Sequence, residues 1–117
     1  MAQKNFKLRA EDIKDLATGR GACFATDMIT VEGHKVRFMY REKPDMDVDS
    51  GWRFFSGFES DEYVDDPNNS AIYDINTIAN YDPDIIPLLD APIGSAFERT
   101  DASLSFKEVF DFEPSED

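Results

Sequence analysis

Apolar residues near the N-terminus recur at the spacing of one helical face. Acidic residues stand early in this segment and Gly19 follows it, as is usual at the two ends of a helix. The pattern therefore predicts a short amphipathic helix over residues 10–18, with an apolar face formed by Leu8, Ile13, Leu16 and Ala17.

Two segments with strand character follow on either side of a turn. Residues 22–31 are rich in small, β-branched and aromatic side chains, and the turn at residues 32–34 returns the chain through residues 35–41. We expect a β-hairpin here. Alternation along its second strand gives two opposite faces, one with Val36, Phe38 and Tyr40 and the other with Arg37 and Arg41.

A third strand is predicted after a polar connection over residues 43–50, and it opens at Gly51. Alternation places Trp52, Phe54 and Phe58 on one face, expected to be the core face, with Arg53 and Phe55 on the other. Burying an aromatic side chain as large as tryptophan removes about 150–250 Å² from water, which stabilises the fold by roughly 4–6 kcal/mol as an upper bound. We therefore expect Trp52→Ala to threaten the fold itself.

Shorter elements are predicted along the rest of the chain. They are a helical turn within residues 59–66, a turn at 67–70, a strand over 71–75, a helix over 77–80 with Asn76 as its N-cap, a helix over 84–89 opened by Pro83, and a strand over 95–99. From Thr100 onward the chain is polar and acidic, and its possible anchors are Leu104, Phe106, Val109, Phe110 and Phe112.

A chain of 117 residues has room for one domain. The elements predict an α+β fold over residues 1–100, mainly an antiparallel sheet of about four to five strands with about two to three short helices. Residues 101–117 are expected to form an acidic tail that is partly docked or disordered.

Charge is distributed unevenly along the sequence. Asp and Glu outnumber Lys and Arg by 25 to 12, a net charge of −13. Residues 1–43 hold nine basic and six acidic side chains (+3), whereas residues 44–117 hold three and nineteen (−16), and the two parts sum to −13. This balance argues against direct binding of nucleic acid, which requires a basic surface, and favours a basic protein partner.

Catalytic and redox chemistry find little support in the sequence. Cys23 is the only cysteine, so no intramolecular disulfide can form, and we interpret it as a buried, reduced thiol. His34, the only histidine, is expected at the tip of the hairpin, far from Cys23 on the opposite strand. With no apolar run at the N-terminus and none of membrane-spanning length, the sequence predicts a cytoplasmic protein. Because no enzyme motif is found, we expect a protein that is not an enzyme and needs no cofactor.

The acidic run over residues 45–49 (DMDVD) resembles part of a calcium-binding loop. An EF-hand loop, however, requires Gly at its sixth position and a bidentate Glu at its twelfth. Ser50 and Ser56 occupy those positions here, so we expect a solvated loop and no metal site. Paired carboxylates for glycoside chemistry stay open, but chance pairs are common among so many acids.

Two sets of residues are candidates for binding. The first is an acidic set with one tyrosine that would bind a basic partner, with a solubilising loop as the alternative: Glu59, Asp61, Glu62, Tyr63, Asp65 and Asp66. The second is an aromatic pocket for a small ligand or peptide, formed by Tyr40, Trp52 and Phe54. At least one of Arg41, Arg53 and Arg99 is expected to pair with an internal Asp or Glu.

Five ordered segments of the chain carry a family resemblance. They are residues 25–29 (ATDMI), 36–45 (VRFMYREKPD), 49–57 (DSGWRFFSG), 76–83 (NTIANYDP) and 91–99 (APIGSAFER). With these segments the sequence resembles the bacterial immunity protein 33 family over roughly residues 20–100. The resemblance implies a cytoplasmic protein that binds and blocks a cognate toxin of a polymorphic toxin system, and it carries over no catalytic or toxin-contact residues.

Overall fold

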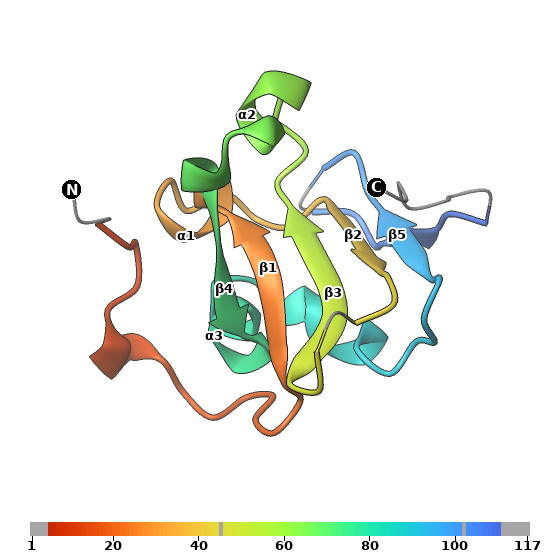
Figure 1. Ribbon diagram of the computed structural model, residues 1–117, viewed down its shortest axis with the longest axis horizontal. Coiled ribbons are helices and arrows are strands. Elements are labelled where there is room, and N and C mark those ends of the chain that lie inside the picture. Colours follow the sequence, from red (N-terminus) through yellow and green to blue (C-terminus); the bar gives the residue numbers. More distant parts are fainter. Residues whose placement is uncertain (1–4, 45, 102, 111–117) are drawn as a thin grey trace.

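A six-stranded sheet forms the centre of the computed structural model, which describes residues 5–44, 46–101 and 103–110 (Figure 1). The strand order is β4-β1-β3-β2-β5-β6, and every neighbouring pair is antiparallel except β1 and β3. This confirms the predicted α+β class and the mainly antiparallel sheet. The strands are β1 (Ala22–Thr26), β2 (Phe38–Arg41), β3 (Asp49–Phe55), β4 (Ser70–Asp74), β5 (Ala96–Glu98) and β6 (Lys107–Glu108).

The predicted hairpin over residues 22–41 is wrong, because β3 lies between β1 and β2. After β1 the chain turns into a short helix, α1 (Asp27–Thr30). Gly33, with φ of +83°, lies in the left-handed region just past α1, and its N–H donates to the carbonyl of Ile29 at 3.1 Å. Glycine serves equally at helix ends and in hairpin turns, so the sequence signal had two structural meanings.

Side chains of β2 alternate as expected, but the residue that enters the core is Met39. Phe38 and Tyr40 share the opposite face and are half-buried, whereas Met39 is fully buried. Val36 is also fully buried, yet it precedes the strand and is held by its own contact, since its N–H donates to the carboxylate of Asp82 at 2.9 Å.

The predicted N-terminal helix over residues 10–18 is also wrong, since only a single 3-10 turn forms there, η1 (Ala10–Asp12). Side-chain amides of the later helix α3 (Ile75–Tyr81) bind the backbone that would have formed helical hydrogen bonds. The N–H groups of Leu16 and Ala17 both donate to Oδ1 of Asn76, at 2.7 and 2.8 Å, and the N–H of Lys14 donates to Oδ1 of Asn80. Tertiary contacts therefore override the local helical pattern.

The remaining short elements follow the predictions with shifts of one or two residues. They are α2 (Asp61–Asp65), η2 (Pro67–Asn69) and η3 (Pro83–Leu88), together with β4, α3 and β5. The N-cap of α3 is Asp74, not the predicted Asn76, and its side chain accepts from the N–H of Asn76 at 2.9 Å. Asn76 is thereby left to bind the N-terminal segment.

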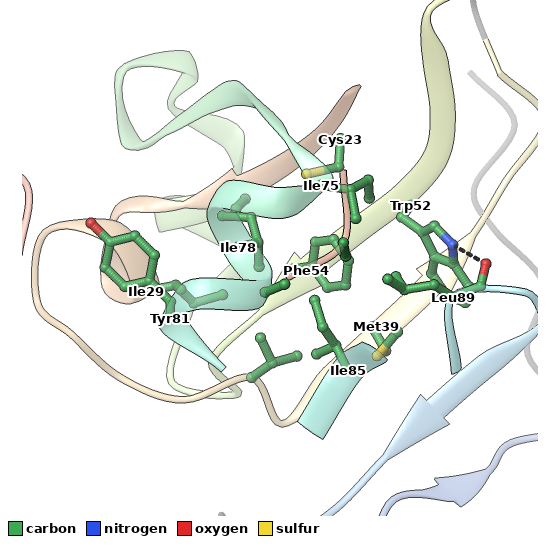
Figure 2. Packing of buried hydrophobic residues seen from close by; sticks show 14 of the residues in the cluster. Cys23, Ile29, Met39, Trp52, Phe54, Ile75, Ile78, Tyr81, Ile85 and Leu89 are labelled. Carbon is green, nitrogen blue, oxygen red and sulfur yellow. Dashed lines mark hydrogen bonds between the residues drawn. The ribbon is translucent and has the colours of Figure 1, made fainter. Parts of the chain in front are cut away.

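The hydrophobic core lies between the sheet and the helices α3 and η3, which cover one face of it (Figure 1). As predicted, β3 directs Trp52 and Phe54 into this core, where they pack with Ile29, Met39, Ile75, Ile78 and Ile85 (Figure 2). The indole Nε1 of Trp52 donates to the carbonyl of Leu89 at 3.1 Å, so the ring is buried with its polar atom satisfied.

Phe58 does not belong to the core face, contrary to the prediction. It lies beyond the end of β3 and is 51% exposed. Its ring lies 4.8 Å from that of His34 and 4.5 Å from the guanidinium of Arg37. Strand alternation cannot be extended past Phe55, because the chain leaves the sheet there.

A buried ion pair joins the C-terminal part of the sheet to η3. Nη2 of Arg99 donates to Asp82 at 2.6 Å, and the two side chains are 1% and 2% exposed. Arg99 also donates to the carbonyl of Val36 and to Asp84, and its guanidinium lies 4.1 Å from the ring of Phe106. This confirms that at least one of the three singled-out arginines pairs internally.

Residues beyond Thr100 contribute to the sheet through β6, which pairs with β5. Phe106 is half-buried and packs against the core. Leu104 and Phe110 are exposed, and Phe112 lies outside the described residues.

Candidate functional site

One face of the sheet is covered by neither α3 nor η3, the helices that enclose the core. In Figure 1 the helices α3 and η3 lie behind the sheet, while β1, β3 and β4 run across the front. We call this front surface the open face. Its side chains point away from the core, on the side of the sheet opposite to Trp52 and Phe54. The register of the strands brings six of them together: Phe24, Phe38, Tyr40, Arg53, Phe55 and Ile72.

Arg53 lies at the centre of the open face and is only 4% exposed. Its guanidinium forms a two-bond ion pair with Asp49, at 2.8 and 2.9 Å, and donates through Nε to Glu42 at 2.6 Å. One side of the guanidinium covers the ring of Phe24, 4.7 Å from its centroid. Burial alone would lower the pKa of Arg53, but the hydrogen bonds to Asp49 and Glu42 outweigh it and raise the pKa, so this side chain stays cationic.

Three aromatic rings lie beside Arg53 on β2 and β3. The rings of Tyr40 and Phe55 are stacked with centroids 5.8 Å apart, and Phe38 lies 5.8 Å from Tyr40 and 6.0 Å from Phe55. All three side chains are half-buried. Burial raises the pKa of Tyr40 above its ordinary value, with a further contribution from the charge of Glu42.

A pocket of about 200 Å³ opens between this aromatic group and the loop that carries α2 and η2. Small-molecule sites usually enclose roughly 300–1,000 Å³. The pocket is therefore smaller than a usual small-molecule site and comparable in size to one long protein side chain. Its lining includes Phe24, Tyr40, Glu42, Phe55, Val64 and Asn69.

The acidic set predicted to bind a partner divides into two parts. The exposed part is carried by α2 and the residue that follows it, and consists of Asp61, Glu62, Asp65 and Asp66. Ser60 caps this helix by accepting from the N–H of Tyr63 at 3.1 Å. Tyr63 itself is half-buried, and burial followed by the charge of Asp27 on α1 raises its pKa.

Glu59, the remaining member of that set, faces inward. Its carboxylate accepts hydrogen bonds from the hydroxyl of Thr26 and from the N–H groups of Ser56 and Gly57, the latter two at 2.9 Å. Burial alone would raise the pKa of Glu59, but these hydrogen bonds outweigh it and lower the pKa. Glu59 therefore fixes the chain just past β3 against the end of β1.

A lowered pKa in the folded protein makes the contribution of Glu59 depend on pH. The contribution is fully present above the ordinary glutamate pKa of about 4.3 and is lost as the pH falls through the lowered folded value. Glu59→Gln should therefore reduce stability at neutral pH, and the difference from wild type should narrow as the pH falls below the ordinary value. Urea unfolding at several pH values measures this. Equal differences across the range would contradict it, and Glu62→Gln, which changes an exposed carboxylate, is the matched control.

The second predicted set, Tyr40, Trp52 and Phe54, is not brought together as one aromatic pocket. Tyr40 lies on the open face, while Trp52 and Phe54 are buried on the core side (Figure 2). Phe54 lines the pocket of the open face, but its side chain is fully buried. Phe24, Glu42 and Val64 were not among the predicted site residues. A sequence signal was available only for Phe24, from the alternation of residues 22–26, where Phe24 separates Cys23 from Ala25.

Of the other candidates from the sequence, Cys23 lies on the core side, whereas Asp49 of the acidic run is largely buried in its ion pair with Arg53 and not in a solvated loop. Cys23 is buried, as predicted, and burial raises the pKa of its thiol. Within residues 5–44, 46–101 and 103–110 no cluster of three or more metal-ligating side chains forms, although Asp45 of the acidic run lies outside those ranges.

Comparison with known proteins decides the family. The model described as the immunity protein Imm33 domain matches residues 23–110, which is most of the chain. The chain belongs to the Imm33 family. No curated protein and no solved structure shows significant similarity to it.

Membership of the Imm33 family implies that the protein neutralises a toxin and is not an enzyme. The resemblance stated from the sequence is thereby confirmed. None of the helices in the described residues has the length and apolar character required to cross a membrane.

Proposed function

We propose that this Imm33 protein is a stoichiometric inhibitor that acts in the cytoplasm and binds a basic cognate toxin through the acidic residues of α2 and the adjoining open face. Family membership supports neutralisation. The observation that supports this particular surface is the position of four exposed carboxylates beside the half-buried aromatic side chains of the open face, with Val64 and Asn69 lining the pocket between them.

The two parts of this surface perform different physical roles. Exposed carboxylates attract a basic partner over distance and can raise the association rate toward ~10⁸ M⁻¹s⁻¹ at low salt. The half-buried aromatic rings provide the apolar area whose burial holds the complex together. Inhibition follows by covering the active site of the toxin or a face next to it, and requires no bond to be made or broken.

A ligand-binding regulatory domain is the alternative suggested by the sequence. Its supporting residues were Tyr40, Trp52 and Phe54, of which only Tyr40 has its side chain on the open face. The small volume of the pocket also favours a protein side chain over a separate ligand. We therefore give toxin binding precedence.

Co-purification with the toxin encoded by the adjacent gene tests the proposal, together with rescue of growth when both proteins are expressed. We expect a one-to-one complex whose affinity falls steeply with salt concentration. Absence of a complex, or failure to restore growth, would contradict the proposal.

Neutralising three acids on α2, with Asp61→Asn, Glu62→Gln and Asp65→Asn combined, should slow association with the toxin by roughly tenfold or more at low salt. The matched control neutralises three exposed acids elsewhere, Glu11→Gln, Asp15→Asn and Asp90→Asn, and changes the net charge by the same amount. Stopped-flow association kinetics compares the two. Equal slowing would show that net charge, not the α2 surface, governs the encounter.

A further inference from the structure

We propose that the pocket of the open face receives a lysine or arginine side chain of the toxin. This rests on the proposed function and adds to it the chemical group that the toxin presents and the place where that group is bound. The pocket, of about 200 Å³, is large enough for a long side chain and lies between the aromatic rings and α2.

The charges around the pocket favour a cation. Arg53 contributes one positive charge, and its two partners Asp49 and Glu42 contribute two negative charges, so the group carries a net charge of −1. Arg53 is buried, and all three of its guanidinium nitrogen atoms already donate hydrogen bonds. Its Nε donates to Glu42, its Nη2 to Asp49, and its Nη1 to both Asp49 and the carbonyl of Trp52. It therefore has little capacity to attract an anion from a partner.

Glu42 is the carboxylate that an incoming cation would meet. Its Oε2 accepts from Arg53, and its side chain remains 31% exposed. Within the part of the chain that the structure describes, no hydrogen bond to its Oε1 is found. A lysine ammonium or arginine guanidinium at the pocket would donate to this oxygen while Arg53 stays in place.

The walls of the pocket match the rest of such a side chain. Phe24, Tyr40, Phe55 and Val64 offer apolar surface along which the methylene groups of lysine or arginine pack while the charged head remains near a carboxylate. The rings themselves attract cations through their negative faces. Asp61 and Asp65, on the same helix as Val64, add negative potential at the entrance.

Two substitutions test the pocket in different ways, with binding of the toxin encoded by the adjacent gene measured by calorimetry. Val64→Lys places a competing ammonium at the entrance, at a side chain that is 44% exposed. Glu42→Gln removes the charge that the toxin side chain would meet. We expect each to weaken binding by roughly tenfold or more.

Ile93→Lys is the matched control for Val64→Lys. Ile93 is 55% exposed, does not line the pocket and precedes β5. We expect it to change the affinity less than about twofold, in keeping with a surface substitution away from the interface. Thermal unfolding of all three variants shows whether each is folded before its affinity is compared. If Glu42→Gln does not fold, Val64→Lys still tests the pocket, because it leaves both ion pairs of Arg53 in place.

A double-mutant cycle identifies the side chain on the toxin. One toxin lysine or arginine should lose affinity on replacement by alanine in the presence of wild-type protein and lose much less in the presence of Glu42→Gln. If wild type binds the toxin but no such residue exists, or if Val64→Lys binds like wild type, the inference is overturned while the proposed function stands. A wild-type protein that does not bind the toxin would overturn both.

Discussion

Replacing Arg99 with alanine is expected to destabilise the protein by about 3–5 kcal/mol, because the substitution leaves the buried carboxylate of Asp82 without its cationic partner. That carboxylate also accepts from the N–H of Val36 and the N–H of Asp84, so it is held inside the fold and cannot move to solvent. Urea unfolding followed by circular dichroism gives the free energy of unfolding.

Arg9→Ala is the matched control for this prediction. Arg9 also pairs with a carboxylate, Glu11 at 3.4 Å, but the two side chains are 80% and 71% exposed. Solvent screens such a pair, and its loss should cost less than about 1 kcal/mol. Similar losses for the two arginines would contradict the dominant role of burial.

The second large effect is expected for Trp52→Ala, at about 3–5 kcal/mol. The indole is 1% exposed and fills the space between Phe54 and Phe97, with ring centroids 6.1 and 6.4 Å away. Removal of the ring loses both the free energy gained by burying its apolar surface and the packing contacts that it makes. The midpoint of thermal unfolding, followed by circular dichroism, measures the loss.

Two further variants separate the contributions at Trp52. Trp52→Phe keeps an aromatic ring but loses the hydrogen bond to the carbonyl of Leu89, so we expect an intermediate loss of about 1–3 kcal/mol. Phe58→Ala should cost less than Trp52→Ala, although the sequence pattern placed both residues on one face, because Phe58 is half-exposed. Equal losses at positions 52 and 58 would contradict the core described here.

The strand β3 shows what local pattern can predict. Alternation alone assigned Trp52 and Phe54 to the core and Arg53 and Phe55 to the other face, because a strand between two neighbours has a fixed periodicity of two. The same reasoning failed at Phe58, where the strand had ended. Alternation predicts the face of a residue only while the residue remains in the sheet.

Long-range contacts explain the larger errors. Asn76 and Asn80 bind the backbone of residues 14–17 from about 60 positions away, and this prevents the helix that the N-terminal pattern favours. Gly33 ends a helix where it was expected to form a hairpin turn. The two asparagines lie outside any window of neighbouring residues, and so does β3, whose position between β1 and β2 excludes the hairpin.

The candidate site was only partly predictable for the same reason. The acidic residues of α2 are adjacent in sequence, so their exposure could be anticipated. The open face depends on strand order, since Phe24, Arg53 and Tyr40 become neighbours only when β3 lies between β1 and β2. No pattern within a single segment indicates that arrangement.

The position of β3 also has a consequence for the order in which the chain can fold. The consecutive strands β2 and β3 form an antiparallel pair across a short connection. Strand β1 can pair with its parallel neighbour only after β3 has been made, and with its antiparallel neighbour only after β4 has been made. During synthesis, Cys23 and Ala25 therefore stay without their sheet partners until β3 and β4 have left the ribosome. We expect β1 to be stabilised late, after the β2–β3 hairpin has provided an edge to receive it.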